Sequence, residues 1–90
     1  MLEKELEQKV ASAAKKKGLL TYKFSSPSQR GVPDRIIIGP KGTLFLELKQ
    51  EGKKPTKLQR HHMEKIRMHG GFAEWADCLE DAVGLMERLR

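Results

Sequence analysis

The chain has 90 residues, a formal net charge of +6 and a single cysteine, Cys78. A chain of this length buries only about 60% of the surface that its unfolded form exposes, so we expect one domain over residues 1–90 with a modest core. One cysteine excludes an intrachain disulfide and a cysteine-rich zinc site, and no apolar run reaches the roughly 20 residues needed to cross a bilayer. The charge favours a polyanion such as nucleic acid as partner, and the lack of a signal-peptide pattern favours a cytoplasmic location.

Hydrophobic periodicity divides the chain into helices and strands. In chain order we expect a helix over about 2–17, strands over 19–24, 33–39 and 45–49, a helix over 57–69, a strand over 72–76 and a helix over 79–89. The order αβββαβα predicts the α/β class, with one central mixed sheet flanked by helices.

Local signals support these boundaries. Acidic residues crowd the start of the first helix and lysines its end, which suits the helix macrodipole. The segment Gly39–Gly42 is rich in chain-reversing residues, so the second and third strands are expected to pair as a hairpin. Thr56 is suited to cap the second helix, whose apolar side contains Leu58, Met63 and Ile66.

The most informative residues are Asp34 and the triplet Glu47-Leu48-Lys49. Side chains two apart in a strand point the same way, so Glu47 and Lys49 share one face. Hairpin pairing brings Asp34 close to Glu47, which collects two carboxylates and an ammonium group at one end of the sheet. Hard oxygen ligands beside an ammonium group are what Mg²⁺-assisted phosphodiester cleavage requires, so the pattern favours a nuclease.

The order and spacing of these residues also carry a family resemblance. The segments Gly31-Val32-Pro33-Asp34-Arg35 and Glu47-Leu48-Lys49, followed by Gln59 in the next helix, resemble the virus-type replication-repair nuclease (VRR-NUC) domain of the PD-(D/E)XK superfamily. The resemblance covers nearly the whole chain and is strongest to stand-alone phage or prophage members. It implies a restriction-endonuclease-like αβββαβ core with a C-terminal helix, and junction-directed DNA cleavage by a homodimer.

The metal-binding roles follow from ligand chemistry. Asp34 and Glu47 are expected to bind one or two Mg²⁺ or Mn²⁺ ions through oxygen, with the backbone carbonyl of Leu48 as a further ligand. Lys49 is expected to orient the attacking water and stabilise negative charge, with general-base action as the alternative.

Two further catalytic residues are assigned by the resemblance. A helix carboxylate often completes the site in this superfamily, and Glu3, Glu5 and Glu7 are the candidates. The distance to the first strand favours Glu7 over Glu3, which lies one turn away on the same stripe of the helix. Gln59 is expected to hydrogen-bond a carboxylate ligand or the phosphate.

Basic residues around these motifs are candidate phosphate contacts. The set comprises Lys23, Arg30, Lys53, Lys54, Lys57 and Arg60. Symmetric cuts on a four-way junction require two active sites, which favours a homodimer, acting in the cytoplasm of a bacterial or phage-infected cell. Two alternatives stay open: a noncatalytic DNA-binding module with a nuclease-like fold, and an adaptor whose basic face binds acidic partners.

Overall fold

The computed structural model describes residues 1–90, and its elements follow the expected order. They are α1 (Glu3–Lys16), β1 (Leu20–Lys23), β2 (Arg35–Gly39), β3 (Gly42–Leu48), α2 (Lys57–Met68), β4 (Phe72–Ala76) and α3 (Leu79–Glu87). The four strands form one sheet in the order β1-β2-β3-β4. The first three are antiparallel neighbours, whereas β4 runs parallel to β3, because α2 carries the chain back to the starting edge. The predicted mixed sheet is therefore confirmed.

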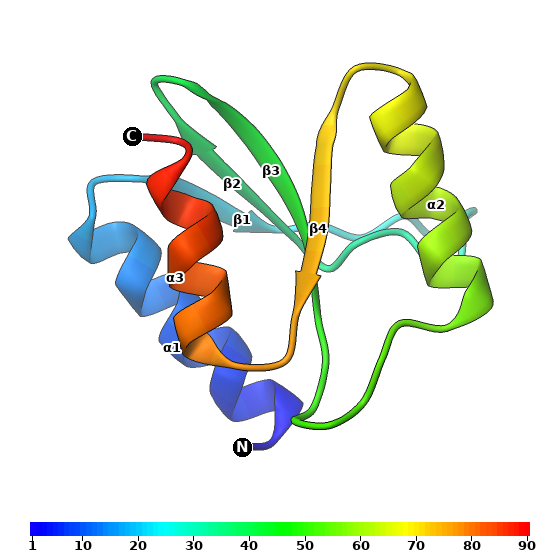
Figure 1. The fold of residues 1–90 in the computed structure, drawn as a ribbon, viewed down its shortest axis with the longest axis horizontal. Coiled ribbons are helices and arrows are strands. Elements are labelled where there is room, and N and C mark those ends of the chain that lie inside the picture. Colours follow the sequence, from blue (N-terminus) through cyan, green and yellow to red (C-terminus); the bar gives the residue numbers. More distant parts are fainter.

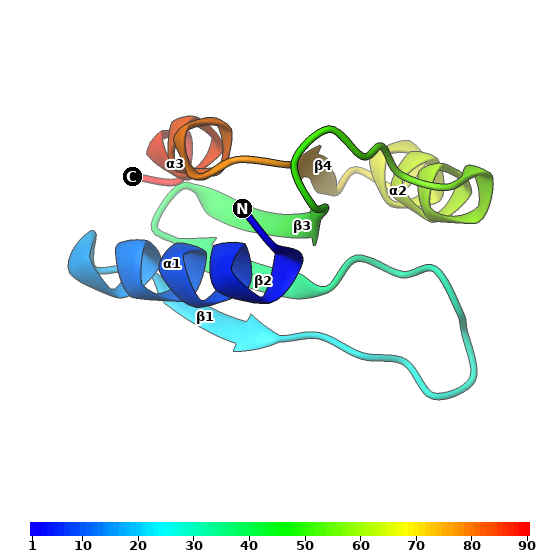
Figure 2. The same ribbon diagram turned by 90° about the horizontal axis from the view of Figure 1, so that it is seen from below.

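Helices cover both faces of the sheet. Figure 1 shows α1 and α3 together on one side and α2 on the other, and the end-on view in Figure 2 separates the same layers. The main core lies beneath α1 and α3, where Leu6, Val10 and Ala14 of α1 are fully buried. Their four-residue spacing places them on one stripe of the helix, which explains why α1 packs along its length. No helix has the length and apolar character needed to cross a membrane.

Alternation along β3 divides its side chains between the two faces. Leu44, Leu46 and Leu48 are buried in the main core. Phe45 and Glu47 therefore point to the α2 side, where Phe24 packs edge-on against Phe45 with ring centroids 6.0 Å apart. This register delivers an acidic side chain to the interior of the α2 side at the end of β3.

Two apolar residues lie elsewhere than their periodicity predicted. Leu2 precedes α1 and is 57% exposed, and Leu58, in the first turn of α2, is 46% exposed. Met63 is the one buried residue of α2. The rest of the helix is more open to solvent, because α2 packs mainly against β4. Thr56 caps α2 as expected, with its side chain accepting a hydrogen bond from the Gln59 N–H.

Candidate active site

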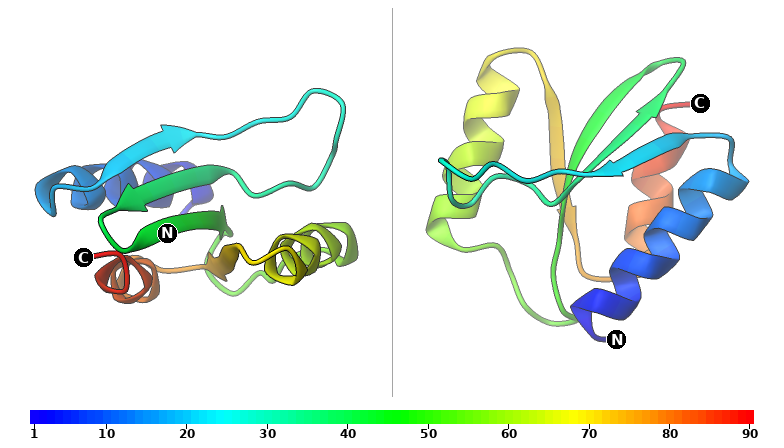
Figure 3. Two further views of the ribbon diagram at one scale, coloured as in Figure 1. Left: turned by 90° about the horizontal axis from the view of Figure 1, so that it is seen from above. Right: turned by 180° about the vertical axis from the view of Figure 1, so that it is seen from behind.

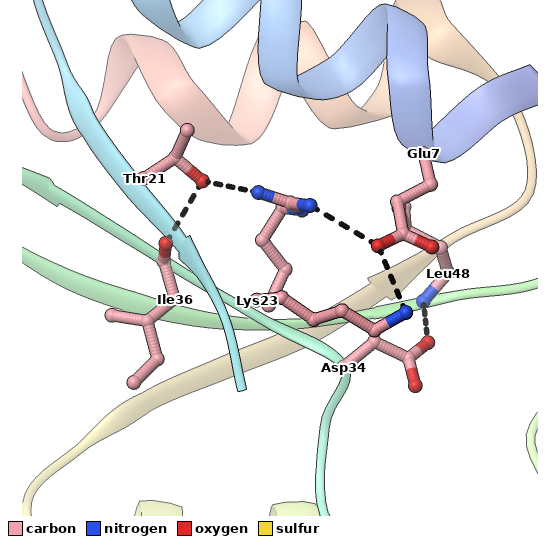
Figure 4. Close-up of polar contacts among 7 residues, drawn as sticks. Glu7, Thr21, Lys23, Asp34, Ile36 and Leu48 are labelled. Carbon is pink, nitrogen blue, oxygen red and sulfur yellow. Dashed lines mark hydrogen bonds and ion pairs between the residues drawn. The ribbon is translucent and has the colours of Figure 1, made fainter. Parts of the chain in front are cut away.

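Asp34 and Glu47 face each other where the β2–β3 hairpin opens. The strand register pairs Arg35 with Leu46, and one further step sets Asp34 opposite Glu47. Asp34 Oδ2 accepts a hydrogen bond from the Leu48 N–H at 3.3 Å, which ties the carboxylate to β3 (Figure 4). Asp34 is half-buried and Glu47 only 1% exposed. The structure thus brings together the two carboxylates that the sequence pattern singled out.

A third carboxylate comes from Glu3, the first residue of α1. One carboxylate oxygen from each of Glu3, Asp34 and Glu47 lies within 4.8 Å of the others, a separation that one cation can bridge. Glu3 is exposed and has no hydrogen bond or ion pair of its own. The cluster therefore joins an exposed carboxylate of α1, a half-buried one at the end of the β1–β2 loop and a buried one of β3.

Glu7 does not occupy the place that the resemblance favoured for it. Its Oε1 lies 3.1 Å from Arg35 Nη2 and 3.7 Å from Lys23 Nζ. Figure 4 shows the Lys23 side chain directed toward Glu7. The two cations lie opposite each other on β1 and β2, and together they hold the Glu7 carboxylate against the sheet. Glu3, one helical turn earlier, faces the cluster instead.

The buried Glu47 carboxyl is the least ordinary group of the site. Burial, then repulsion from Asp34, raises the pKa of Glu47 from 4.5 to about 9, although the Lys49 ammonium group opposes the shift. Glu47 Oε1 is buried without any hydrogen-bond partner. Such an oxygen is costly to leave unpaired, and a divalent cation would both pair it and offset the repulsion. The donor set therefore fits a hard metal ion.

Gln59 links the end of β3 to the start of α2. Its side-chain oxygen accepts from the Thr56 N–H at 2.8 Å and from Lys49 Nζ at 3.2 Å. Its amide nitrogen donates to Glu47 Oε2 at 3.3 Å. The same residue closes a capping box with Thr56, so the local geometry of the helix terminus fixes the amide orientation. Gln59 therefore bridges Lys49 and Glu47.

The loop between β1 and β2 extends beyond the sheet, as both views in Figure 3 show, and its residue Gly31 lies against α2. Gly31 lies in this loop with φ +82°, and a Cβ there would come within 2.8 Å of Leu58 Cγ and 3.2 Å of His62 Cδ2. Only glycine combines the positive φ with so close an approach. Pro33 is buried and precedes Asp34, so the loop delivers the carboxylate along a constrained path.

The expected DNA-contacting residues surround this end of the molecule. Lys23 ends β1, and Arg30 lies in the β1–β2 loop. Lys53 and Lys54 lie in the β3–α2 connection, and Lys57 and Arg60 lie in the first turn of α2. All six are exposed, and of these only Lys23 forms an ion pair. Beside them, Glu3 and Lys23 line a hollow of about 490 Å³ between α1 and β1.

Arg35 and Thr21 belong to this neighbourhood, and sequence reasoning gave neither a role. Arg35 Nη1 donates to Thr21 Oγ1 at 3.1 Å, and Thr21 Oγ1 in turn donates to the Ile36 carbonyl at 3.0 Å. Strand alternation was a signal for this arrangement, because it places Arg35 on the face of β2 that carries Ile37 toward α1.

Comparison with known proteins identifies the family. No model of a known protein family matches the chain. The chain is 45% identical to "Putative nuclease p44" of Acyrthosiphon pisum secondary endosymbiont phage 1 over 62 residues. This aligned segment covers 67% of each protein. A solved structure described as a VRR_NUC domain matches with a TM-score of 0.84 at 26% identity, over 98% of this chain and 97% of that one.

A second structure, described as a VRR_NUC domain protein, also matches with a TM-score of 0.84, over 99% of this chain and 88% of that one. Because its sequence identity to this chain is 19%, this match supports the fold alone. The relative shares 45% identity with this chain, and the first structure shares the fold over nearly its whole length. The chain therefore belongs to the VRR-NUC nucleases of the PD-(D/E)XK superfamily.

Proposed function

We propose that this nuclease is a Mg²⁺- or Mn²⁺-dependent DNA endonuclease whose ion is held by Asp34, Glu47 and Glu3. The observation that carries the proposal is the buried Glu47 Oε1, which has no partner and lies among carboxylates that repel it. A protein keeps such a group only where something else compensates its cost, and a divalent cation does so with oxygen ligands. The backbone carbonyl of Leu48, next to the N–H that Asp34 holds, is a further candidate ligand.

The residues divide the work of hydrolysis among them. When bound, the ion supplies Lewis-acid stabilisation of the scissile phosphate and makes water a stronger acid. Lys49 orients the attacking water and offsets the charge that develops on the phosphate, because its ammonium group lies on the same strand face as Glu47. Gln59 keeps Lys49 and Glu47 in register through its two hydrogen bonds.

Substrate contacts are assigned to the exposed basic residues around the cluster. Lys53, Lys54 and Lys57 lie in and after the connection that leaves the catalytic strand, so phosphates bound there would hold the DNA strand across the site. The sequence contains no separate base-reading motif, and the net charge of +6 favours recognition of the backbone. We propose branched DNA, including four-way junctions, as the preferred substrate and a homodimer as the active form, since paired cuts require two sites.

Cleavage assays test this proposal. Labelled four-way junction, duplex and single-stranded DNA are incubated with the protein in Mg²⁺, Mn²⁺ or EDTA, in parallel with Glu47→Gln and Asp34→Asn. The expected result is metal-dependent cleavage with a preference for the junction and loss of cleavage in both variants. Cleavage that persists in EDTA, or that Glu47→Gln leaves unchanged, contradicts the proposed chemistry. Equal cleavage of duplex and junction contradicts only the proposed substrate preference.

A further inference from the structure

We propose that the ion pair between Glu7 and Arg35 is a latch that positions the first turn of α1, so that Glu3 reaches Asp34 and Glu47. This inference rests on the proposed function, because it assigns positioning residues to the same carboxylate cluster. In this arrangement Glu7 and Arg35 act through Glu3, and neither residue binds the ion.

Glu7 provides the polar connection between α1 and the sheet. Every side-chain hydrogen bond and ion pair that joins a residue of α1 to a strand involves Glu7, with Arg35 at 3.1 Å and Lys23 at 3.7 Å. The Glu7 side chain is 24% exposed and that of Arg35 is 11% exposed, so water screens the pair only in part. The contact therefore sets how far α1 slides and turns relative to β2.

Arg35 is itself held from two directions. One Nη donates to Thr21 on β1 and the other to Glu7 on α1, each at 3.1 Å. A guanidinium group presents its donors in a rigid planar fork, so one side chain can join a strand and a helix at once. Arg35 also follows Asp34 directly in the chain. A displacement of Arg35 would therefore move Asp34 through the backbone and Glu3 through α1.

Glu3 has no comparable anchor of its own. The helix starts after Leu2 without a side-chain cap, and Glu3 makes no polar contact. The nearby contacts of Met1 go to Glu51, whose side chain is 71% exposed. Residues four apart in a helix lie one turn apart on the same face, so the position of Glu7 determines that of Glu3. Leu6 packs this turn against the core, but apolar contact restricts sliding less sharply than a directional hydrogen bond.

Measurements of metal affinity distinguish two roles for Glu7: positioning Glu3 through the ion pair with Arg35, and binding the ion directly, as the resemblance favoured. The measurement is Mn²⁺ titration calorimetry on the parent chain, Glu7→Ala, Arg35→Ala and the double variant. We expect each single variant to lower the affinity for Mn²⁺ about tenfold or more, and the double variant to lower it no further, because both changes open the same contact. At saturating Mn²⁺ the cleavage rate should recover, since Glu3, Asp34 and Glu47 are all intact.

A matched control breaks a different ion pair of the same helix. Lys17 follows α1 and lies 2.7 Å from Glu87 of α3, far from the cluster along the helix. Lys17→Ala should leave the Mn²⁺ affinity unchanged. If Arg35→Ala does not fold, Glu7→Gln replaces it, because that side chain keeps its length and its hydrogen bond to Arg35 while losing the charge. It should lower the affinity less than Glu7→Ala does.

Two results overturn the latch. Unchanged Mn²⁺ affinity in both Glu7→Ala and Arg35→Ala shows that α1 is positioned without the pair. Loss of binding in Glu7→Ala together with normal binding in Arg35→Ala shows that Glu7 is itself a ligand. A parent chain whose Mn²⁺ binding is insensitive to Glu47→Gln is a separate outcome, which removes the proposed metal site and the latch with it.

Discussion

Replacement of Glu47 with glutamine is expected to stabilise the metal-free protein increasingly as the pH rises. In the folded protein the pKa of Glu47 is raised to about 9, mainly by burial, from an ordinary value of 4.5. Between these two values the folded chain keeps a proton that the unfolded chain releases, so stability falls as pH rises. The contribution is fully present below pH 4.5 and is lost as the pH rises through about 9.

The size of the effect follows from the width of that window. Each pH unit within it lowers the free energy of unfolding by about 1.4 kcal/mol. At pH 7, about 2.5 units above the ordinary pKa, the loss is on the order of 3 kcal/mol, while at pH 5 it is below about 1 kcal/mol. A glutamine side chain does not titrate, so the variant avoids this loss. For a domain of this size a difference of 1 kcal/mol shifts Tm by about 4–8 °C.

The assay is urea denaturation in EDTA at several pH values from 5 to 8.5. Glu5→Gln is the matched control, because it makes the same replacement on the exposed side of α1, where Glu5 has no polar contact. The stability difference between Glu47→Gln and the parent should grow with pH, and that of the control should stay flat. Mn²⁺ should stabilise the parent and not the variant. A Glu47→Gln variant that is destabilised equally at every pH shows that Glu47 does not titrate with a raised pKa in the folded protein.

Three further predictions concern residues around the cluster. Gln59→Ala should lower the cleavage rate about 10- to 100-fold, because it removes the link between Glu47 and Lys49, and steady-state kinetics measure this loss. It should also lower the free energy of unfolding by about 1 kcal/mol, because it removes part of the α2 cap, and urea denaturation measures that loss. Gly31→Ala should cost at least about 1 kcal/mol, since φ is +82° and Leu58 blocks a Cβ; Leu58→Ala should recover part of it, and no recovery contradicts the contact. Lys54→Ala should reduce the salt slope of DNA binding by about one without changing the rate at saturation, and an unchanged slope places Lys54 away from phosphate.

The elements were predictable because local patterns and tertiary packing agree. The strand at Phe72–Ala76 was placed at its observed bounds, and the hairpin joined by Gly39–Gly42 pairs as expected. Hydrophobic periodicity could not show which part of each helix packs against the rest of the protein. Leu58 has the right spacing for a core residue, yet it lies in the first turn of α2, where it is 46% exposed and faces the loop at Gly31. Exposure of this kind depends on a neighbour that is distant in sequence.

The carboxylate pair was predictable, and its third member was not. Asp34 and Glu47 meet because hairpin register and strand alternation are local consequences of sequence. Glu3 and Glu7 share one helix face, so periodicity treats them alike. The choice between them depends on how far α1 slides along the sheet, and Arg35 and Lys23 decide this by pairing with Glu7. A test of which carboxylates meet a cation therefore also tests the placement of α1.

The most direct test of the metal site is anomalous scattering from crystals grown with Mn²⁺. We expect a peak about 2.1 Å from carboxylate oxygens of Asp34 and Glu47, with Glu3 directed toward it and Glu7 still paired with Arg35. A peak ligated by Glu7, or one confined to the separate group formed by Asp77, Cys78 and Asp81, contradicts the proposed metal site. No peak at the Asp34–Glu47 cluster at a Mn²⁺ concentration that supports cleavage contradicts it most strongly.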